Sequence, residues 1–297
     1  MPGSPPRHAA TGIAFAAAAY VSWGVFPLYF RQLAAVPAVE ILAHRILWSA
    51  VFMAALVTAL RRWGDAREAL RRPGTLPTLT ATALLISANW LTYIWAVNAG
   101  HVLEASLGYF VNPLVTVLLG VAFLRETLTR PQKVAIALAA AGVVALVVRA
   151  GTVPWIALAL AVTFGLYGLL RKRLRVDAVT GLLGEVGVLA PVALLFLGWR
   201  ASRGQLHLGP APRETLFLLS SGVVTALPLL WFAAGVRRLR LATVGVLQYL
   251  NPTMQFAIAV FAFREPFGAA HGLAFGCIWA SLAIYTADAV ASARAAP

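Results

Sequence analysis

The sequence is poor in charge. Only 11% of its 297 residues are charged, and Asp and Glu together number 10, whereas roughly 25% of the residues of a soluble domain are charged. Apolar residues make up 61% of the chain, and the mean hydropathy is +0.82. A chain of this composition cannot cover its apolar surface in water. The composition therefore excludes a soluble domain and predicts an integral protein of the lipid bilayer.

Cysteine and the common catalytic motifs are also scarce. The one cysteine, Cys277, lies in an apolar run, so an internal disulfide and a paired-thiol redox or metal site are excluded. The chain lacks HExxH, GxSxG and Walker sequences, and His44 has no second histidine with metal-ligand spacing. These absences argue against an enzyme and against ATP as the direct energy source. We expect no cofactor and no metal.

The net charge of +14 does not indicate a nucleic-acid partner. The basic residues lie in the connections between apolar segments, where helical membrane proteins collect them on the cytoplasmic side. A nucleic-acid-binding protein would gather them on one face. Arginine outnumbers lysine 22 to 2, which is typical of a GC-rich bacterial genome.

Ten apolar segments are long enough, at about 20 residues, to cross a bilayer as helices. They span residues 11–33, 39–60, 76–98, 104–124, 131–148, 153–170, 178–199, 214–235, 241–263 and 269–290. With the N-terminus in the cytoplasm, 17 basic residues fall on the cytoplasmic side and 6 on the other. This bias predicts an all-α, multi-pass protein of the bacterial inner membrane with both termini cytoplasmic.

A motif recurs at a fixed interval. Asn112-Pro113 recurs as Asn251-Pro252, and Arg125-Glu126 recurs as Arg264-Glu265, in each case 139 residues later. This recurrence predicts a duplicated unit. The Arg-Glu pairs at the segment ends have two readings, a structural role in the loop or a gate latch.

The two halves, 1–150 and 151–297, contain five segments each. Because five is odd, the second half must enter the membrane in the opposite orientation, and equivalent loops of the two halves do differ in basic residues. Inverted repeats are typical of secondary transporters, whose substrate site lies near the midplane between the repeats.

The chain also resembles a known family. The stretches that carry the resemblance are YVSWG (20–24), EILAHRILWS (40–49), NWLTYIWAVN (89–98), LEASLGYFVNPL (103–114) and LQYLNPT (247–253). They are similar to the drug/metabolite transporter superfamily, in its EamA-like branch, and closely resemble the RarD group of chloramphenicol-sensitive proteins. The resemblance implies ten helices in two inverted five-helix repeats and a central cavity used by alternating access. It does not imply one substrate, because members of the superfamily move amino acids, other metabolites and drugs.

The two Asn-Pro sites are the first candidates for the cavity wall. Tyr109 shares a helix face with Asn112, and Gln248 with Asn251; Tyr249 adjoins them. Each proline frees a carbonyl one turn upstream, which in lipid needs a partner. The segments therefore either line the cavity or form structural kinks that their own asparagines cap.

Ionisable residues in the second segment form another candidate group. Arg45 must pair or face water at this depth, and Glu104 is its expected partner; the alternative is that Glu40 and Arg45 snorkel to the interface. His44 is either a proton relay or a hydrogen-bonded packing residue. Glu185 can bind a proton or a cation, or bond to a neighbour.

The remaining site candidates are aromatic and amide side chains of the first, third and eighth segments: Tyr20, Trp23, Asn89, Trp90, Tyr93, Trp95, Asn98 and Trp231. A cavity with such walls suits a moderately apolar or zwitterionic organic solute; the alternative for the tryptophans is an interfacial belt.

Small residues recur every four positions in the fifth and tenth segments: Ala137, Ala141 and Ala145, and Gly268, Gly272, Gly276 and Ala280. They predict close helix packing or a homodimer contact.

The sequence thus predicts a secondary transporter of small organic solutes that works by alternating access. A passive channel and a non-transporting scaffold remain alternatives. Proton coupling and facilitated diffusion are equally open, as are import and export.

Overall fold

The computed structural model describes residues 6–124, 128–151, 153–174, 176–236 and 247–295, and all regular structure in these ranges is helical. In chain order the helices are α1 (Pro6–Gly24), α2 (Phe26–Arg31), α3 (Ala38–Ala59), α4 (Trp63–Arg71), α5 (Thr75–Asn98), α6 (Val102–Leu124), α7 (Arg130–Ala150), α8 (Trp155–Arg173), α9 (Ala178–Ser202), α10 (Pro212–Val236), α12 (Leu250–Ala257), the π-helical turn η1 (Ile258–Ala262) and α13 (Ala269–Ala295).

The helices confirm the predicted segments to within a few residues, with three differences. The first segment breaks at Val25 into α1 and α2, because Pro27 lacks the N–H that would continue the helix. The ninth segment divides into α12 and η1, and its first part, 241–246, lies outside the described residues. The predicted loop 61–75 contains the short amphipathic helix α4.

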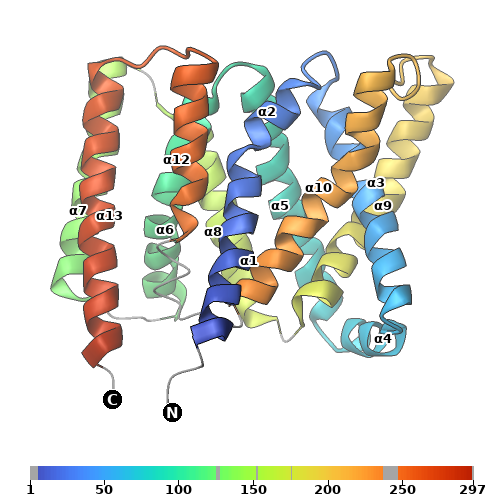
Figure 1. Cartoon of the computed structure of the whole chain (residues 1–297), viewed down its shortest axis with the longest axis horizontal. Helices are drawn as coiled ribbons and strands as arrows, with labels where there is room; N and C mark the ends of the chain where they lie inside the picture. Colours follow the sequence, from blue (N-terminus) through green and yellow to red (C-terminus); the bar gives the residue numbers. More distant parts are fainter. Residues whose placement is uncertain (1–5, 125–127, 152, 175, 237–246, 296–297) are drawn as a thin grey trace.

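The helices stand side by side, with the start of α1, the end of α13 and α4 at one end of the molecule (Figure 1). Helix α7 packs against α13, α6 against α8, α1 against α10, and α3 against both α9 and α10, while α12 lies between α1 and α6. Seven of the described helical spans are long and apolar enough to cross a membrane, and α8 and α12–η1 are shorter apolar helices. The protein is therefore an all-helical, polytopic membrane protein.

Large apolar side chains cover the outside of the helices. Leu195 is 75% exposed and Phe261 is 77% exposed. Such exposure would be unfavourable in water, but acyl chains solvate these side chains as well as a protein core does. The exposed apolar surface agrees with the composition.

Helices α3 and α10 approach each other closely at Gly222. A Cβ atom on this residue would lie 2.3 Å from the carbonyl carbon of Trp48 and 2.7 Å from the amide nitrogen of Ser49. The Ser49 hydroxyl donates to the Gly222 carbonyl at 3.4 Å. Small residues allow such approach between membrane helices, so Gly222 fixes the distance between a helix of each half.

The small-residue stripes do not form the close contact between α7 and α13, so of their two predicted roles only the homodimer contact stays a prediction. Helices α7 and α13 do pack together, but through neighbouring faces: a Cβ on Gly142 would lie 2.7 Å from the Cβ of Cys277, and Ser281 donates to the Ala135 carbonyl at 2.6 Å. Gly276 and Ala280 are exposed instead. A different face of α13 contacts α7, because Phe275 and Ile278, and not the glycines, point into the protein.

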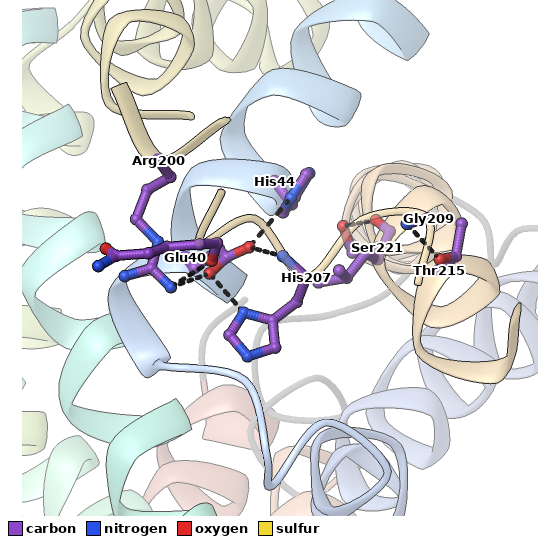
Figure 2. A network of polar contacts seen from close by, with 9 residues as sticks. Glu40, His44, Arg200, His207, Gly209, Thr215 and Ser221 are labelled. Atoms are coloured by element: carbon purple, nitrogen blue, oxygen red, sulfur yellow. Dashed lines mark hydrogen bonds and ion pairs between the residues drawn. The ribbon is translucent and has the colours of Figure 1, made fainter. Parts of the chain in front are cut away.

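A buried carboxylate fastens the start of α3 to the connection between α9 and α10 (Figure 2). One oxygen of Glu40 lies 2.9 Å from the guanidinium of Arg200 and 2.9 Å from Nδ1 of His207. The other accepts the His207 backbone N–H at 2.8 Å, and Nε2 of His44 lies 4.0 Å away. Glu40 is 0% exposed, so the alternative that it snorkels to the interface is wrong.

Adding one methyl group at the α3–α10 contact should destabilise the protein. We expect Gly222→Ala to lower the free energy of unfolding by about 1–3 kcal/mol, because the backbones must separate. The matched control is Gly187→Ala in α9, where an added Cβ meets no atom within 4 Å. Thermal unfolding in detergent should show a lower midpoint for Gly222→Ala alone; equal midpoints for the two variants would contradict the close contact.

Removing the charge of Glu40 should also be costly. Glu40→Gln leaves Arg200 and His207 around a neutral group, and breaking a buried pair costs roughly 3–5 kcal/mol. The control is Glu68→Gln, because the Glu68 side chain is 74% exposed in its pair with Arg72 and such pairs contribute about 0–1 kcal/mol. Thermal unfolding distinguishes them; a midpoint for Glu40→Gln as high as the control's would show that this network does not hold the α9–α10 connection.

Candidate functional site

A cavity of about 520 Å³ lies among the helices of both halves. Its walls come from α1 to α3, α5, α6, α8 to α10 and α12, together with Gln248 just before α12. The lining residues are Tyr20, Trp23, Phe26, Arg45, Ile86, Asn89, Trp90, Tyr93, Tyr109, Asn112, Phe164, Tyr167, Arg171, Ala178, Leu182, Glu185, Thr225, Leu229, Leu230, Phe232, Gln248, Asn251, Pro252 and Gln255. This volume is in the range of sites for small organic molecules.

Ten of the sixteen site residues predicted from the sequence lie in this wall. They are Tyr20, Trp23, Arg45, Asn89, Trp90, Tyr93, Tyr109, Asn112, Gln248 and Asn251. Six others lie elsewhere: His44, Trp95, Asn98, Glu104, Trp231 and Tyr249.

The outlying aromatic residues face away from the cavity. Trp95 is 41% exposed and its ring centroid lies 5.7 Å from that of His101 and 5.4 Å from that of Trp155. Trp231 is partly exposed, and its neighbour Phe232 lines the cavity instead. Tyr249 turns toward α13, where its hydroxyl bonds to Thr286.

The outlying polar residues make contacts outside the cavity. His44 lies one turn after Glu40 in α3, and neither of its ring nitrogens has a hydrogen-bond partner. Asn98 donates to the Leu33 carbonyl at 3.4 Å. Glu104 accepts the Ile156 N–H at 2.9 Å, and its negative charge suits the start of α8.

The expected ion pair between Arg45 and Glu104 is therefore wrong. Arg45 is 3% exposed, and its Nε donates to the Thr225 hydroxyl at 2.6 Å. Its guanidinium lies 4.1 Å from the centroid of the Trp90 ring and 5.4 Å from that of Phe30. Its Nη1 is buried and has no hydrogen-bond partner. Arg45 thus brings a charge to the wall without an acidic partner among the described residues.

Aromatic rings form the wall on the α1–α10 side. The Trp23 ring centroid lies 5.6 Å from those of Tyr20 and Phe232, and Tyr20 and Phe232 are 5.8 Å apart. Such edge and tilted contacts favour a rigid aromatic surface. Opposite them, Tyr93 and Tyr109 meet at 5.7 Å, and the Tyr93 hydroxyl is buried without a partner.

The helix break at Pro27 is satisfied from the other half of the chain. A proline at this position cannot bond to the carbonyl four residues earlier, which belongs to Trp23. The Gln255 amide donates to that carbonyl at 3.2 Å and to the Asn251 side-chain oxygen at 2.7 Å. Near the second Asn-Pro site, the Pro252 carbonyl accepts the Ser106 hydroxyl at 2.9 Å. The carbonyl that Pro27 frees next to the cavity thus bonds to a polar side chain, as lipid requires.

Asn89 has a structural contact in addition to its place in the wall. Its amide donates to the Leu160 carbonyl and the Thr163 hydroxyl, both at 2.9 Å. These bonds fasten α5 to α8. Because both amide hydrogens are used, only its oxygen is available to a solute.

The other end of the cavity reaches the ends of α8 and α9. There, Nε of Arg171 lies 3.6 Å from Glu185, and the Tyr167 hydroxyl lies 3.4 Å from the other oxygen of Glu185. The Arg171 side chain is 19% exposed, whereas Glu185 is 3% exposed. The ion pair neutralises both charges at this end.

Sequence reasoning missed several wall residues. Gln255 follows Asn251 by one helical turn, a spacing that places both on one face. Arg171 follows the predicted segment 153–170 and is therefore expected in a loop, whereas α8 continues to Arg173. Phe232 adjoins Trp231, and of these two aromatic residues only Phe232 lines the cavity. Phe164 and Tyr167 have no signal in the sequence that separates them from packing residues.

Glu265 has a structural role at a helix start. Its two carboxylate oxygens accept the N–H groups of Val102 at 2.8 Å and Leu103 at 2.7 Å. Burial raises the pKa of the Glu265 carboxyl, and these two bonds offset part of the rise. The contact favours the structural interpretation of Arg264-Glu265. Arg125-Glu126 lies outside the described residues.

Among the residues that the structure describes, no group of three or more His, Cys, Asp or Glu side chains could hold a metal ion. The polar groups of the wall are amides, hydroxyls and guanidinium groups, with one carboxylate already paired. This arrangement can bind an organic molecule by ring contacts and hydrogen bonds, and it contains no nucleophile with an adjacent base.

Comparison with known proteins agrees with this arrangement. The model of the EamA-like transporter family matches residues 10–148. The chain is 45% identical to the uncharacterized transporter YojE of Bacillus subtilis, over 97% of this chain and 98% of that protein. It is 44% identical to the protein RarD of Escherichia coli, over 95% of this chain and 96% of that protein.

A chloramphenicol-sensitive protein RarD of Pseudomonas aeruginosa is 34% identical, over 92% of each chain. A crystal structure with 20% identity shares the fold, with a TM-score of 0.60 over 92% of this chain and 96% of the other. Identity at this level over nearly the whole length places the chain among transporters and not among enzymes. The protein is a membrane transporter that belongs to the EamA-like family.

Proposed function

We propose that the protein is a secondary transporter that moves small organic solutes by alternating access through the central cavity. The observation that carries this proposal is the 520 Å³ cavity, whose aromatic and amide wall is built from both halves of the chain. A metabolite, an amino acid or an amphenicol-like drug has the size and mixed polarity that such a wall accepts.

Helix partnerships support ten spanning segments in two inverted repeats, 1–150 and 151–297. Segments that are equivalent in the two halves pack on each other: α3 on α9, α6 on α12, and α7 on α13. Other contacts also occur in equivalent pairs. Because α1 corresponds to α8 and α10 to α5, the contact α1–α10 has its equivalent in α8–α5. In the same way, the contact α6–α8 has its equivalent in α12–α1. This is the pattern expected for a pseudo-two-fold axis in the membrane plane.

Contacts between α6 and α12–η1 support opposite directions for these two helices. Val102 and Leu103, at the start of α6, contact Glu265, which follows η1. Ser106, further along α6, contacts Pro252 near the start of α12. Increasing residue numbers along α6 therefore meet decreasing residue numbers along α12–η1, as inversion requires.

Charge supports a cytoplasmic location for the end with both termini. This end carries α4 (Figure 1), whose neighbourhood contains Arg61, Arg62, Arg67, Arg71 and Arg72, and the positive-inside rule places such loops in the cytoplasm. The Arg171–Glu185 end of the cavity lies on this side, while the Glu40 network closes the other. The structure then corresponds to an inward-facing state.

A passive channel is the alternative function. It requires a continuous path across the membrane, whereas Arg45 in the cavity wall is 3% exposed and Phe30 beside it is 1% exposed. Side chains buried at this level favour alternating access over an open channel. Whether protons drive the cycle, and in which direction the solute moves, are decided by transport measurements.

The inverted topology is tested by thiol labelling in intact cells. Starting from Cys277→Ser, a cysteine is introduced as Thr129→Cys or as Gly268→Cys. We expect a membrane-impermeant reagent to label the variant at 268 from outside and the variant at 129 only after lysis, because the two connections should lie on opposite sides. The cysteine-free background controls for non-specific labelling. Equal labelling of both sites in intact cells would disprove the inversion.

Transport is tested with purified protein in proteoliposomes, using a panel of metabolites and antibiotics with and without a pH gradient. For a solute that is transported, Asn112→Ala and Asn251→Ala should each reduce uptake by about tenfold, the effect of losing a hydrogen bond of about 1.4 kcal/mol. The control is Asn98→Ala, because Asn98 is partly buried but lies outside the cavity wall. Normal uptake by both wall variants would remove the cavity assignment, and an absence of uptake for the whole panel would count against a transporter of these solutes.

A further inference from the structure

We propose that the cavity selects solutes that carry a single carboxylate on an apolar, aromatic body, and that Arg45 binds the carboxylate. This inference rests on the proposed transport function and specifies its substrate class. It depends on the position of Arg45, on the partners of the surrounding acids and on the aromatic wall.

Arg45 lies two turns into α3, 3% exposed, in the wall of the cavity. An arginine within a membrane helix is costly to insert, and such residues commonly mark substrate pathways. A position that served packing alone would be filled at lower cost by an uncharged side chain.

The acids that could neutralise Arg45 are already bound to other groups. Glu40 contacts Arg200 and His207, and Glu104 caps the start of α8 at Ile156. Glu185 pairs with Arg171 at the far end of the cavity. In the ranges that the structure covers, no carboxylate lies within ion-pair distance of Arg45, so the cavity carries a net positive charge.

The contacts that Arg45 does make hold it in place without neutralising it. The centroid of the Trp90 ring lies 4.1 Å from the guanidinium, and such a cation–π contact is stronger when it is desolvated. The Thr225 hydroxyl accepts from Nε at 2.6 Å. Nη1 remains buried without a hydrogen-bond partner. The stacked guanidinium is thus oriented in advance, with donor capacity left for an anion.

A carboxylate completes this site better than other groups. The guanidinium fork matches the two oxygens of a carboxylate, and the charge-assisted bonds that result are about twice as strong as neutral ones. Because Arg171 is occupied by Glu185, one uncompensated charge remains, which suits a monoanion and not a phosphate dianion. Trp23, Phe232 and Tyr20 supply the apolar surface for the rest of the solute.

The test measures binding by purified protein in nanodiscs with probes that share one skeleton. Isothermal titration compares 3-phenylpropanoate with 3-phenylpropanamide, 3-phenylpropylamine and 2-phenylethyl phosphate. We expect the carboxylate to bind at least about tenfold more tightly than the neutral amide, which corresponds to about 1.4 kcal/mol, and the amine to bind most weakly. An amide or amine that binds as tightly as the carboxylate overturns the proposal, and so does tighter binding of the phosphate.

Variants assign the preference to Arg45. Arg45→Gln should abolish the carboxylate-over-amide ratio, and Arg45→Lys should keep part of it, because the charge remains while the fork is lost. The control Arg149→Gln removes an exposed arginine at the end of α7 and should keep the full ratio. A ratio that survives in Arg45→Gln overturns the assignment. If that variant does not fold, the wild-type ratio and the lysine variant decide.

Binding and transport fail separately in this design. Carboxylate preference without uptake in proteoliposomes would support the anion site and count against the transport function. Uptake of neutral or cationic solutes by a protein that shows no carboxylate preference would do the reverse.

Discussion

Inside a bilayer no water is available to a broken backbone hydrogen bond, and this constraint explains most of the polar contacts in the structure. The carbonyl of Trp23, freed by Pro27, is bonded to Gln255 from the other half of the chain. The first N–H groups of α6 are bonded to Glu265, and that of Ile156 in α8 to Glu104. Interruptions of the helices are therefore points where distant segments are joined, and the cavity lies among them.

Much of the fold could be predicted because membrane helices have simple requirements. A membrane helix requires a run of about 20 apolar residues, and such a run can be recognised in a sequence. The helix bounds therefore agree with the predicted segments to within a few residues. The break at Val25 and the π-helical turn at Ile258–Ala262 were not predicted. Both depend on which partner is present to satisfy the backbone, and that partner comes from elsewhere in the chain.

The candidate site was predictable in part for the same reason. Helical periodicity separates Asn89 and Tyr93 from Trp95, but it does not say which face turns inward; the structure places the first two in the wall and Trp95 outside. The partner of Arg45 could not be derived, since a guanidinium in apolar surroundings can be held by rings as well as by an acid. Composition indicates which residues need partners, whereas packing decides which partners they receive.

The carboxylates at helix starts matter for the conformational change that the proposed transport cycle requires. Glu104 and Glu265 bind N–H groups of neighbouring helices, and Glu40 is bound by the connection after α9. If these ends separate into water, each lost bond is exchanged for one to solvent, so the free-energy difference is small, about 0.5–1.5 kcal/mol per bond. The bond between Gln255 and Trp23 lies in the cavity wall, where it joins the two halves of the chain. The contacts at the helix starts can therefore break and re-form at low cost, whereas the contact between Gln255 and Trp23 holds the two halves together beside the cavity.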